Sequence, residues 1–134
     1  MLGDKIGGTK GKVTSRRVLA NPGGGPKMET SFEGTGKCLG IDVRETGTYW
    51  SAMRPDGTLY GEGQGIIMGQ GGHGATWIGQ GIGILKGDGS VTFRGAVYYY
   101  SASEAWSRLN SVAAVFEYGV DAQGNTSSEL WEWK

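Results

Sequence analysis

Glycine recurs at every second position in two stretches near the middle of this chain, GEGQG at residues 61–65 and GQGIG at residues 79–83. A period of two is the side-chain period of a β-strand, so each set of glycines lies on one face of its strand. A phosphate-binding glycine loop is excluded, because such a loop joins a strand to a helix and no helical pattern follows here. The feature therefore predicts strands with one face almost free of side chains.

Strand-like runs separated by turn sequences account for most of the 134 residues. Breaker clusters such as NPGGGP at 21–26 and RPDG at 54–57 are typical of turns. After residue 100 the pattern changes, since Ser101 and Glu104 have the spacing of a helix capping box. We predict one short helix near residues 102–110 and eight strands, over residues 9–19, 27–37, 39–53, 58–68, 75–86, 90–100, 112–120 and 126–133.

Short turns between consecutive strands favour an antiparallel meander, and evenly spaced strands are typical of a barrel or a sandwich. A barrel is the better choice, because closing a small sheet needs strong local coiling and repeated glycines permit it. The sequence therefore predicts an all-β fold, an antiparallel β-barrel of about eight strands. We expect one domain over residues 1–134, with residues 1–7 as a loose N-terminal leader.

Composition and charge narrow the class of partner. Thirteen basic residues balance thirteen acidic ones, which leaves no electrostatic footprint for nucleic acid or an anionic membrane. The chain has no apolar run of about 18 residues and no apolar signal-peptide segment at its start. Cys38 is its only cysteine, so no intrachain disulfide can form, as is usual in a reducing compartment. We expect a cytoplasmic protein that binds neither nucleic acid nor membrane.

The sequence shows no pattern of residues that is typical of a metal or cofactor site. The chain has one histidine, His73, in a glycine-rich turn. With one histidine and one cysteine, a metal site would need a carboxylate cluster that the pattern does not offer. No spacing places His73 in a catalytic triad. We therefore expect no metal and no cofactor.

The alternation divides the middle strands into two faces. Simple hairpin registers place Tyr49 opposite Glu62, Gly63 near Gly81 and Ile82 opposite Arg94. They put the glycines on one face together with Trp50, Trp77 and Phe93, and a mixture of apolar and polar residues on the other. Ligand pockets are commonly lined by such a mixture, and an eight-stranded barrel can hold one small ligand. If the mixed face is the interior, Glu62 and Arg94 are paired across Gln80, and the ligand-binding candidates are Tyr49, Glu62, Gln64, Gln80, Arg94 and Tyr98.

The opposite assignment is equally open. The charged residues then face solvent, and the glycine-rich face forms the core with tryptophan rings packed over glycines. A register slip of one residue exchanges the two faces, so the sequence leaves both assignments standing.

The run YGEGQGIIM…GATWIGQGIGIL…GSVTFRGAVYYY at residues 60–100 resembles small, mostly uncharacterised bacterial proteins with an allene-oxide-cyclase-like barrel of the calycin type. That group includes cyclases and proteins with no assigned activity, so the resemblance implies a cavity rather than a reaction. No catalytic motif of a cyclase matches residue by residue, and no site residue is transferred.

Three functions remain under consideration. The favoured one is a barrel that binds a small, partly apolar molecule in its cavity. The second is a cofactor-independent isomerase or cyclase with Glu62 or a tyrosine as the acid/base group. The third is an interaction or structural protein with a filled core, which acts through an oligomer surface. We also expect a homo-oligomer, a dimer, because Trp131 and Trp133 share one face near the C-terminus.

Overall fold

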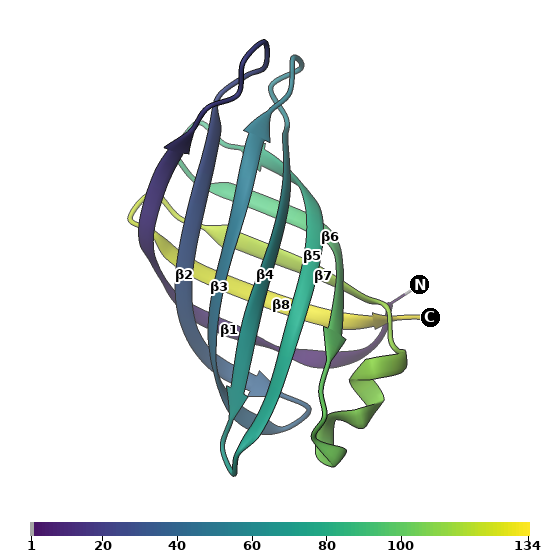
Figure 1. The fold of residues 1–134 in the computed structure, drawn as a ribbon. Helices are drawn as coiled ribbons and strands as arrows, with labels where there is room; N and C mark the ends of the chain where they lie inside the picture. The colour runs from purple at the N-terminus through teal and green to yellow at the C-terminus, as the bar shows by residue number, and fades with distance from the viewer. Residues whose placement is uncertain (1) are drawn as a thin grey trace.

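Eight antiparallel strands close into a barrel in the computed structural model, which describes residues 2–134 (Figure 1). Each strand pairs with the next along the chain, and the last pairs with the first. The predicted eight-stranded meander is confirmed. The strands are β1 (Leu2–Leu19), β2 (Lys27–Cys38), β3 (Ile41–Met53), β4 (Leu59–Gly69), β5 (His73–Leu85), β6 (Val91–Tyr100), β7 (Ala114–Val120) and β8 (Asn125–Trp133).

Strand β1 begins earlier than the sequence predicts. From Leu2 onward, the expected leader is part of the strand, since Leu2 pairs with Trp133 and Lys5 with Trp131; Met1 lies outside the described residues. The register shifts on either side of Lys5, and such irregularities hide the alternation that marks a strand in the sequence. These pairs close the barrel against β8.

A short 3-10 helix, η1 (Glu104–Ser111), lies at one end of the barrel beside β6 (Figure 1). The helix was predicted, but its capping box is wrong. The hydroxyl of Ser101 donates a hydrogen bond to the carbonyl of Gly74 at 2.6 Å and accepts one from the backbone N–H of Ser103 at 3.0 Å. The helix buries Trp106 completely, and the Trp106 indole donates to the Cys38 carbonyl.

The glycine-rich face of β4 and β5 is the interior of the barrel. Paired residues in neighbouring strands share a face, and one such row joins Gly47, Gly65, Trp77 and Tyr99. A Cβ on Gly47 would lie 2.7 Å from the Phe32 ring, and a Cβ on Gly65 would overlap the Trp77 indole. Aromatic rings therefore pack directly on the strand backbone where glycine leaves room.

The aromatic interior forms two layers. One layer, near η1, gathers Trp106 and Leu109 with apolar residues of the strands such as Val43 and Ile67. The other gathers Phe32, Phe93, Tyr118 and Val120, with Tyr49 packed against them. Trp50, predicted for the same face, instead lies outside against Tyr60, with ring centroids 5.8 Å apart.

Two hairpin registers differ from the simple ones expected. Tyr49 pairs with Gly63 rather than Glu62, and this one-residue difference moves Tyr49 to the interior. Gly63 pairs with Gly79 rather than Gly81, a difference of two residues that leaves every side chain on its face. The predicted pairing across the β5–β6 turn is confirmed, with Ile82 opposite Arg94.

The packing of Trp77 on Gly65 predicts a stability effect. Gly65→Ala forces the indole out of its place, so we expect a loss of about 2–3 kcal/mol in the free energy of unfolding. Gly74→Ala is the matched control, because a Cβ there meets nothing within 4 Å. Urea unfolding followed by tryptophan fluorescence measures both. Equal effects of the two substitutions would contradict the packing.

Candidate functional site

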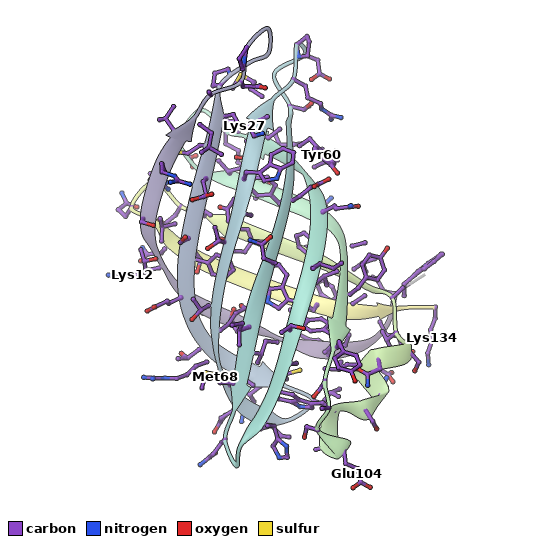
Figure 2. All side chains as sticks on the ribbon, viewed as in Figure 1. Lys12, Lys27, Tyr60, Met68, Glu104 and Lys134 are labelled. Carbon is purple, nitrogen blue, oxygen red and sulfur yellow. The ribbon has the colours of Figure 1, made fainter. Side chains whose placement is uncertain are left out.

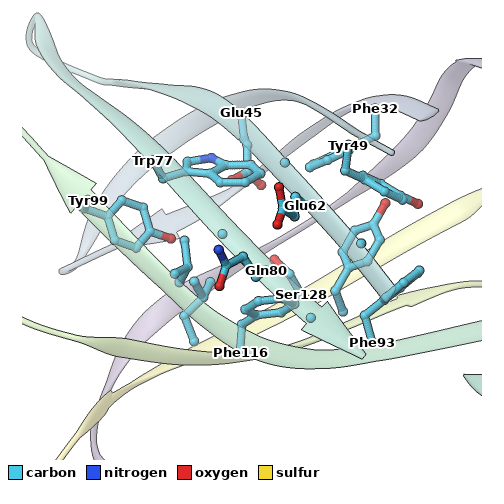
Figure 3. Close-up of a pocket in the computed structure, with 17 residues that line it drawn as sticks. Phe32, Glu45, Tyr49, Glu62, Trp77, Gln80, Phe93, Tyr99, Phe116 and Ser128 are labelled. Atoms are coloured by element: carbon cyan, nitrogen blue, oxygen red, sulfur yellow. The ribbon is translucent and has the colours of Figure 1, made fainter. Parts of the chain in front are cut away.

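A cavity of about 80 Å³ lies inside the barrel and borders both aromatic layers (Figure 3). Glycines of β4 and β5 form one wall, and aromatic side chains from β2, β3, β6 and β7 form much of the rest. The lining comprises Phe32, Glu45, Tyr49, Gly61, Glu62, Gly63, Trp77, Gly79, Gln80, Gly81, Phe93, Val97, Tyr99, Phe116, Tyr118, Ser128 and Leu130.

Missing side chains on β5 account for part of this space. A Cβ on Gly79 would make only moderately close contacts, 3.2 Å to the Ala96 carbonyl oxygen and 3.5 Å to Val97. Gly65 is different, because Trp77 occupies the space above it. The same glycine pattern therefore seats an aromatic ring at one level of the barrel and leaves a cavity at the next.

Glu45 places a carboxyl group in the interior of the barrel, with 7% of the residue's surface exposed. The hydroxyl of Thr9 donates a hydrogen bond to Glu45 Oε1 at 2.7 Å, and Thr9 Oγ1 lies 3.1 Å from the hydroxyl oxygen of Ser128. Strand β2 lies between Thr9 and Glu45, and it presents Gly36 and Gly34 at the paired positions. Because these glycines carry no side chain, the hydroxyl of β1 reaches the carboxyl of β3.

Burial raises the pKa of Glu45 above its ordinary value, while the Thr9 hydroxyl and the nearby Trp77 indole N–H oppose the rise. Burial and the Glu45 charge together raise the pKa of the Cys38 thiol to about 11 and also raise the pKa of Tyr99. A carboxyl group in such surroundings holds its proton more tightly than a surface carboxyl. It can then donate a hydrogen bond or transfer a proton.

Two buried donors on the cavity wall make no hydrogen bond of normal geometry among residues 2–134: the indole N–H of Trp77, which lies near Glu45, and the hydroxyl of Tyr118, which lies near that of Tyr49. Tyr118 packs edge-on against Tyr49, with ring centroids 5.6 Å apart. Buried polar groups are nearly always paired, because an unpaired one costs roughly 1–3 kcal/mol. The two donors are therefore suited to an acceptor atom inside the cavity.

The six residues predicted to bind a ligand do not gather at one place. Tyr49 lies inside, on the cavity wall. Glu62 and Gln80 are cross-strand neighbours that border the cavity, but they belong to the outward-facing row of Trp50. Gln64, Arg94 and Tyr98 are exposed on the outer face.

The predicted ion pair between Glu62 and Arg94 is wrong. Arg94, with 80% of its side chain exposed, lies 3.4 Å from Glu117 of β7. Glu62 accepts a hydrogen bond from the Tyr60 hydroxyl instead, at 2.6 Å. Glu62 shares its row with Gln80 and Ala96, whereas Arg94 lies two residues before Ala96 on β6 and belongs to the next row.

Four features of the site were not predicted from the sequence: Glu45, Thr9, Ser128 and the polar role of Trp77. Glu45 had a usable signal, since it alternates with Val43, Gly47 and Tyr49 and so shares their face. Thr9 and Ser128 had none, because a hydroxyl residue in a strand is equally common on either face.

Neither a family model nor a curated protein matches the sequence, but solved structures share the fold. A protein of unknown function from Rhodopseudomonas palustris matches with a TM-score of 0.82 at 12% identity, over 98% of this chain and 97% of its own. A protein from Acinetobacter baumannii described as β-barrel-like also gives 0.82 at 12% identity, over 98% and 94%.

A third similar structure, from Penicillium herquei, is described as an enzyme and matches with a TM-score of 0.68 at 15% identity, over 96% of this chain and 92% of its own. At these identities the likeness concerns the fold alone. The resemblance to small, uncharacterised bacterial barrel proteins is thereby confirmed.

Within residues 2–134, no group of three or more His, Cys, Asp and Glu side chains is arranged to hold a metal ion. No helix of this part of the chain has the length and apolar character needed to cross a membrane.

The raised pKa of Glu45 predicts a pH-dependent stability. The contribution of Glu45 to the free energy of unfolding is complete below the ordinary carboxyl pKa. This contribution is lost as the pH rises through the raised pKa of Glu45 in the folded protein. Glu45→Gln keeps a neutral acceptor for Thr9 and cannot ionise. We expect the variant to gain stability relative to the wild type between pH 4 and pH 8 in urea unfolding. A stability difference that is the same at both pH values would contradict the assignment.

Proposed function

We propose that this protein binds a small, mainly apolar molecule carrying a hydrogen-bond acceptor inside the barrel. The observation that carries the proposal is the pair of donors that lack a hydrogen bond of normal geometry, Trp77 and Tyr118, on the wall of an aromatic cavity. An acceptor such as a carbonyl oxygen would pair with one of them and remove the cost of leaving it unsatisfied.

The dimensions and chemistry of the cavity restrict the ligand. A volume of about 80 Å³ favours a compact molecule rather than a long chain or a dinucleotide. The lining is largely aromatic and aliphatic, which favours an apolar body. Burial favours the neutral form of Glu45, which can donate a hydrogen bond, and the same apolar surroundings disfavour a negative charge on the ligand. A neutral ketone, lactone or ester therefore suits the site.

Catalysis without a cofactor is the second candidate, and one observation favours it. A carboxyl group with a raised pKa in an apolar cavity is typical of general acid/base catalysts. The enzyme of the same fold in Penicillium herquei supports the view that such a barrel can accommodate catalysis. In this reading Glu45 replaces Glu62 as the group that moves a proton.

The binding proposal predicts that acetone, which is small enough for the cavity, binds more tightly than isobutene, which has a similar shape but no comparable acceptor. We expect about a tenfold difference in Kd, because one hydrogen bond inside the cavity is worth roughly 1–1.5 kcal/mol. Isothermal titration calorimetry and quenching of tryptophan fluorescence measure the two affinities. Equal affinities, or no saturable binding of either compound, would refute the proposal.

A cavity-filling variant controls for binding elsewhere on the protein. Gly79→Leu places an isobutyl group in the cavity with modest crowding, and Gly74→Leu adds the same group on β5 where a Cβ meets nothing within 4 Å. We expect Gly79→Leu to abolish acetone binding and Gly74→Leu to leave it unchanged. Circular dichroism checks that both variants keep the fold.

The catalytic alternative makes a separate prediction. If Glu45 moves protons, the methyl hydrogens of bound acetone exchange with deuterium from D₂O faster with the wild type than with Glu45→Gln. Proton NMR of the ketone follows the exchange directly. Wild-type exchange no faster than that of the variant, with binding intact in both, would leave a binding protein rather than an acid/base enzyme.

A further inference from the structure

The outer surface of β4–β6 carries apolar side chains where a solvated barrel normally carries polar ones. We infer that this surface is a self-association site at which a second copy of the chain packs face to face, related by a two-fold axis. The outer apolar patch consists of Ile66, Met68, Ile78, Tyr98 and Tyr100, each between 48% and 65% exposed.

Register places the patch on adjacent rows of one sheet face. Tyr100 pairs with Thr76 and Thr76 with Ile66, and the next row joins Tyr98 through Ile78 to Gln64. Neither row contains a charged side chain across β4, β5 and β6. Figure 2 shows the side chains of β4, Met68 among them, projecting from the barrel wall. The result is a continuous uncharged surface rather than scattered apolar residues.

The area of the patch fits a dimer. The exposed parts of its five side chains present on the order of 600 Å² of apolar surface, which is at the upper end for a monomer. A stable complex buries about 800 Å² on each partner. The uncharged neighbours Gln64, Thr76 and Gln80 extend the surface to that size. A closed barrel also has no free strand edge, so a partner must pack on the sheet face rather than add a strand.

Charged residues at the two ends of the patch favour a second copy of the chain as the partner and set the orientation of that copy. Arg44 pairs with Met68 at one end of the patch, and Glu62 lies one row beyond Gln64 at the other end. Neither residue forms an ion pair within residues 2–134. A two-fold axis between the Ile66 row and the Ile78 row brings Arg44 of each copy opposite Glu62 of the other. The surface is thus complementary to itself, as an isologous dimer requires.

Sedimentation velocity over a range of concentrations tests the inference. We expect the wild type to have twice the chain mass of 14.2 kDa at micromolar concentration. Ile78→Glu should weaken the dimer at least about a hundredfold, since it buries a charge at the centre of the interface. Val18→Glu is the matched control, because Val18 is 77% exposed and lies on β1, away from the patch. A wild-type monomer, or an Ile78→Glu variant that dimerises normally, would overturn the inference.

Charge reversal tests the orientation of the two copies. Arg44→Glu and Glu62→Arg should each weaken the dimer about tenfold. The double variant should recover most of the loss, because both intersubunit pairs re-form with opposite sign. Losses that simply add in the double variant would overturn the proposed pairing. Circular dichroism and urea midpoints confirm that each variant is folded, and Ile66→Gln provides a milder second test of the patch.

A lipid surface is the competing occupant. Wild-type protein and Ile78→Glu are therefore also sedimented with phosphatidylcholine vesicles. Vesicle binding by a monomeric wild type that is lost in the variant would overturn the inference and assign the patch to lipid. A dimeric wild type that stays in solution supports it.

Discussion

The contact between aromatic rings and bare strand backbone is the interaction on which this barrel depends. Trp77 rests where Gly65 has no side chain, and Phe32 and Trp77 both crowd the position of Gly47. An eight-stranded barrel has an interior only wide enough for packed side chains or one small ligand. Glycine on one strand lets the ring of the residue paired with it on the next strand lie over the backbone and fill that interior, as Phe32 does at Gly47 and Trp77 at Gly65. Where no ring reaches the glycines, the cavity remains.

The same arrangement gives the interior its chemistry. Glycines on β2 allow Thr9 and Glu45 to meet across an intervening strand, so a carboxyl group is held deep in an apolar space. Its pKa rises because the surroundings solvate a charge poorly. The outer face of β4–β6 is also apolar, with Ile66, Met68 and Ile78 exposed. The two proposals therefore concern different faces of the same strands, ligand binding on the inner face and self-association on the outer one.

Much of the fold was predictable from the sequence, because alternation and turn residues are local signals. The glycine runs at 61–65 and 79–83 indicated two strands with one face free of side chains. The turn sequences divided the chain into eight strands. The site was less predictable, because it depends on registers. A slip of one residue between β3 and β4 moved Tyr49 inside, while Glu62 stayed outside. Thr9 and Glu45 lie 36 positions apart in sequence, and only the closed barrel brings them together.

A crystal of the protein pressurised with xenon tests the central claim most directly. Xenon occupies apolar cavities without requiring a specific polar group. If the glycine face lines the interior, xenon density should appear between Trp77, Phe116 and Gly79. The same crystal should show Glu45 directed at Thr9. An interior without xenon, filled by side chains, or a Trp77 ring on the outer surface would contradict the cavity and the function proposed for it.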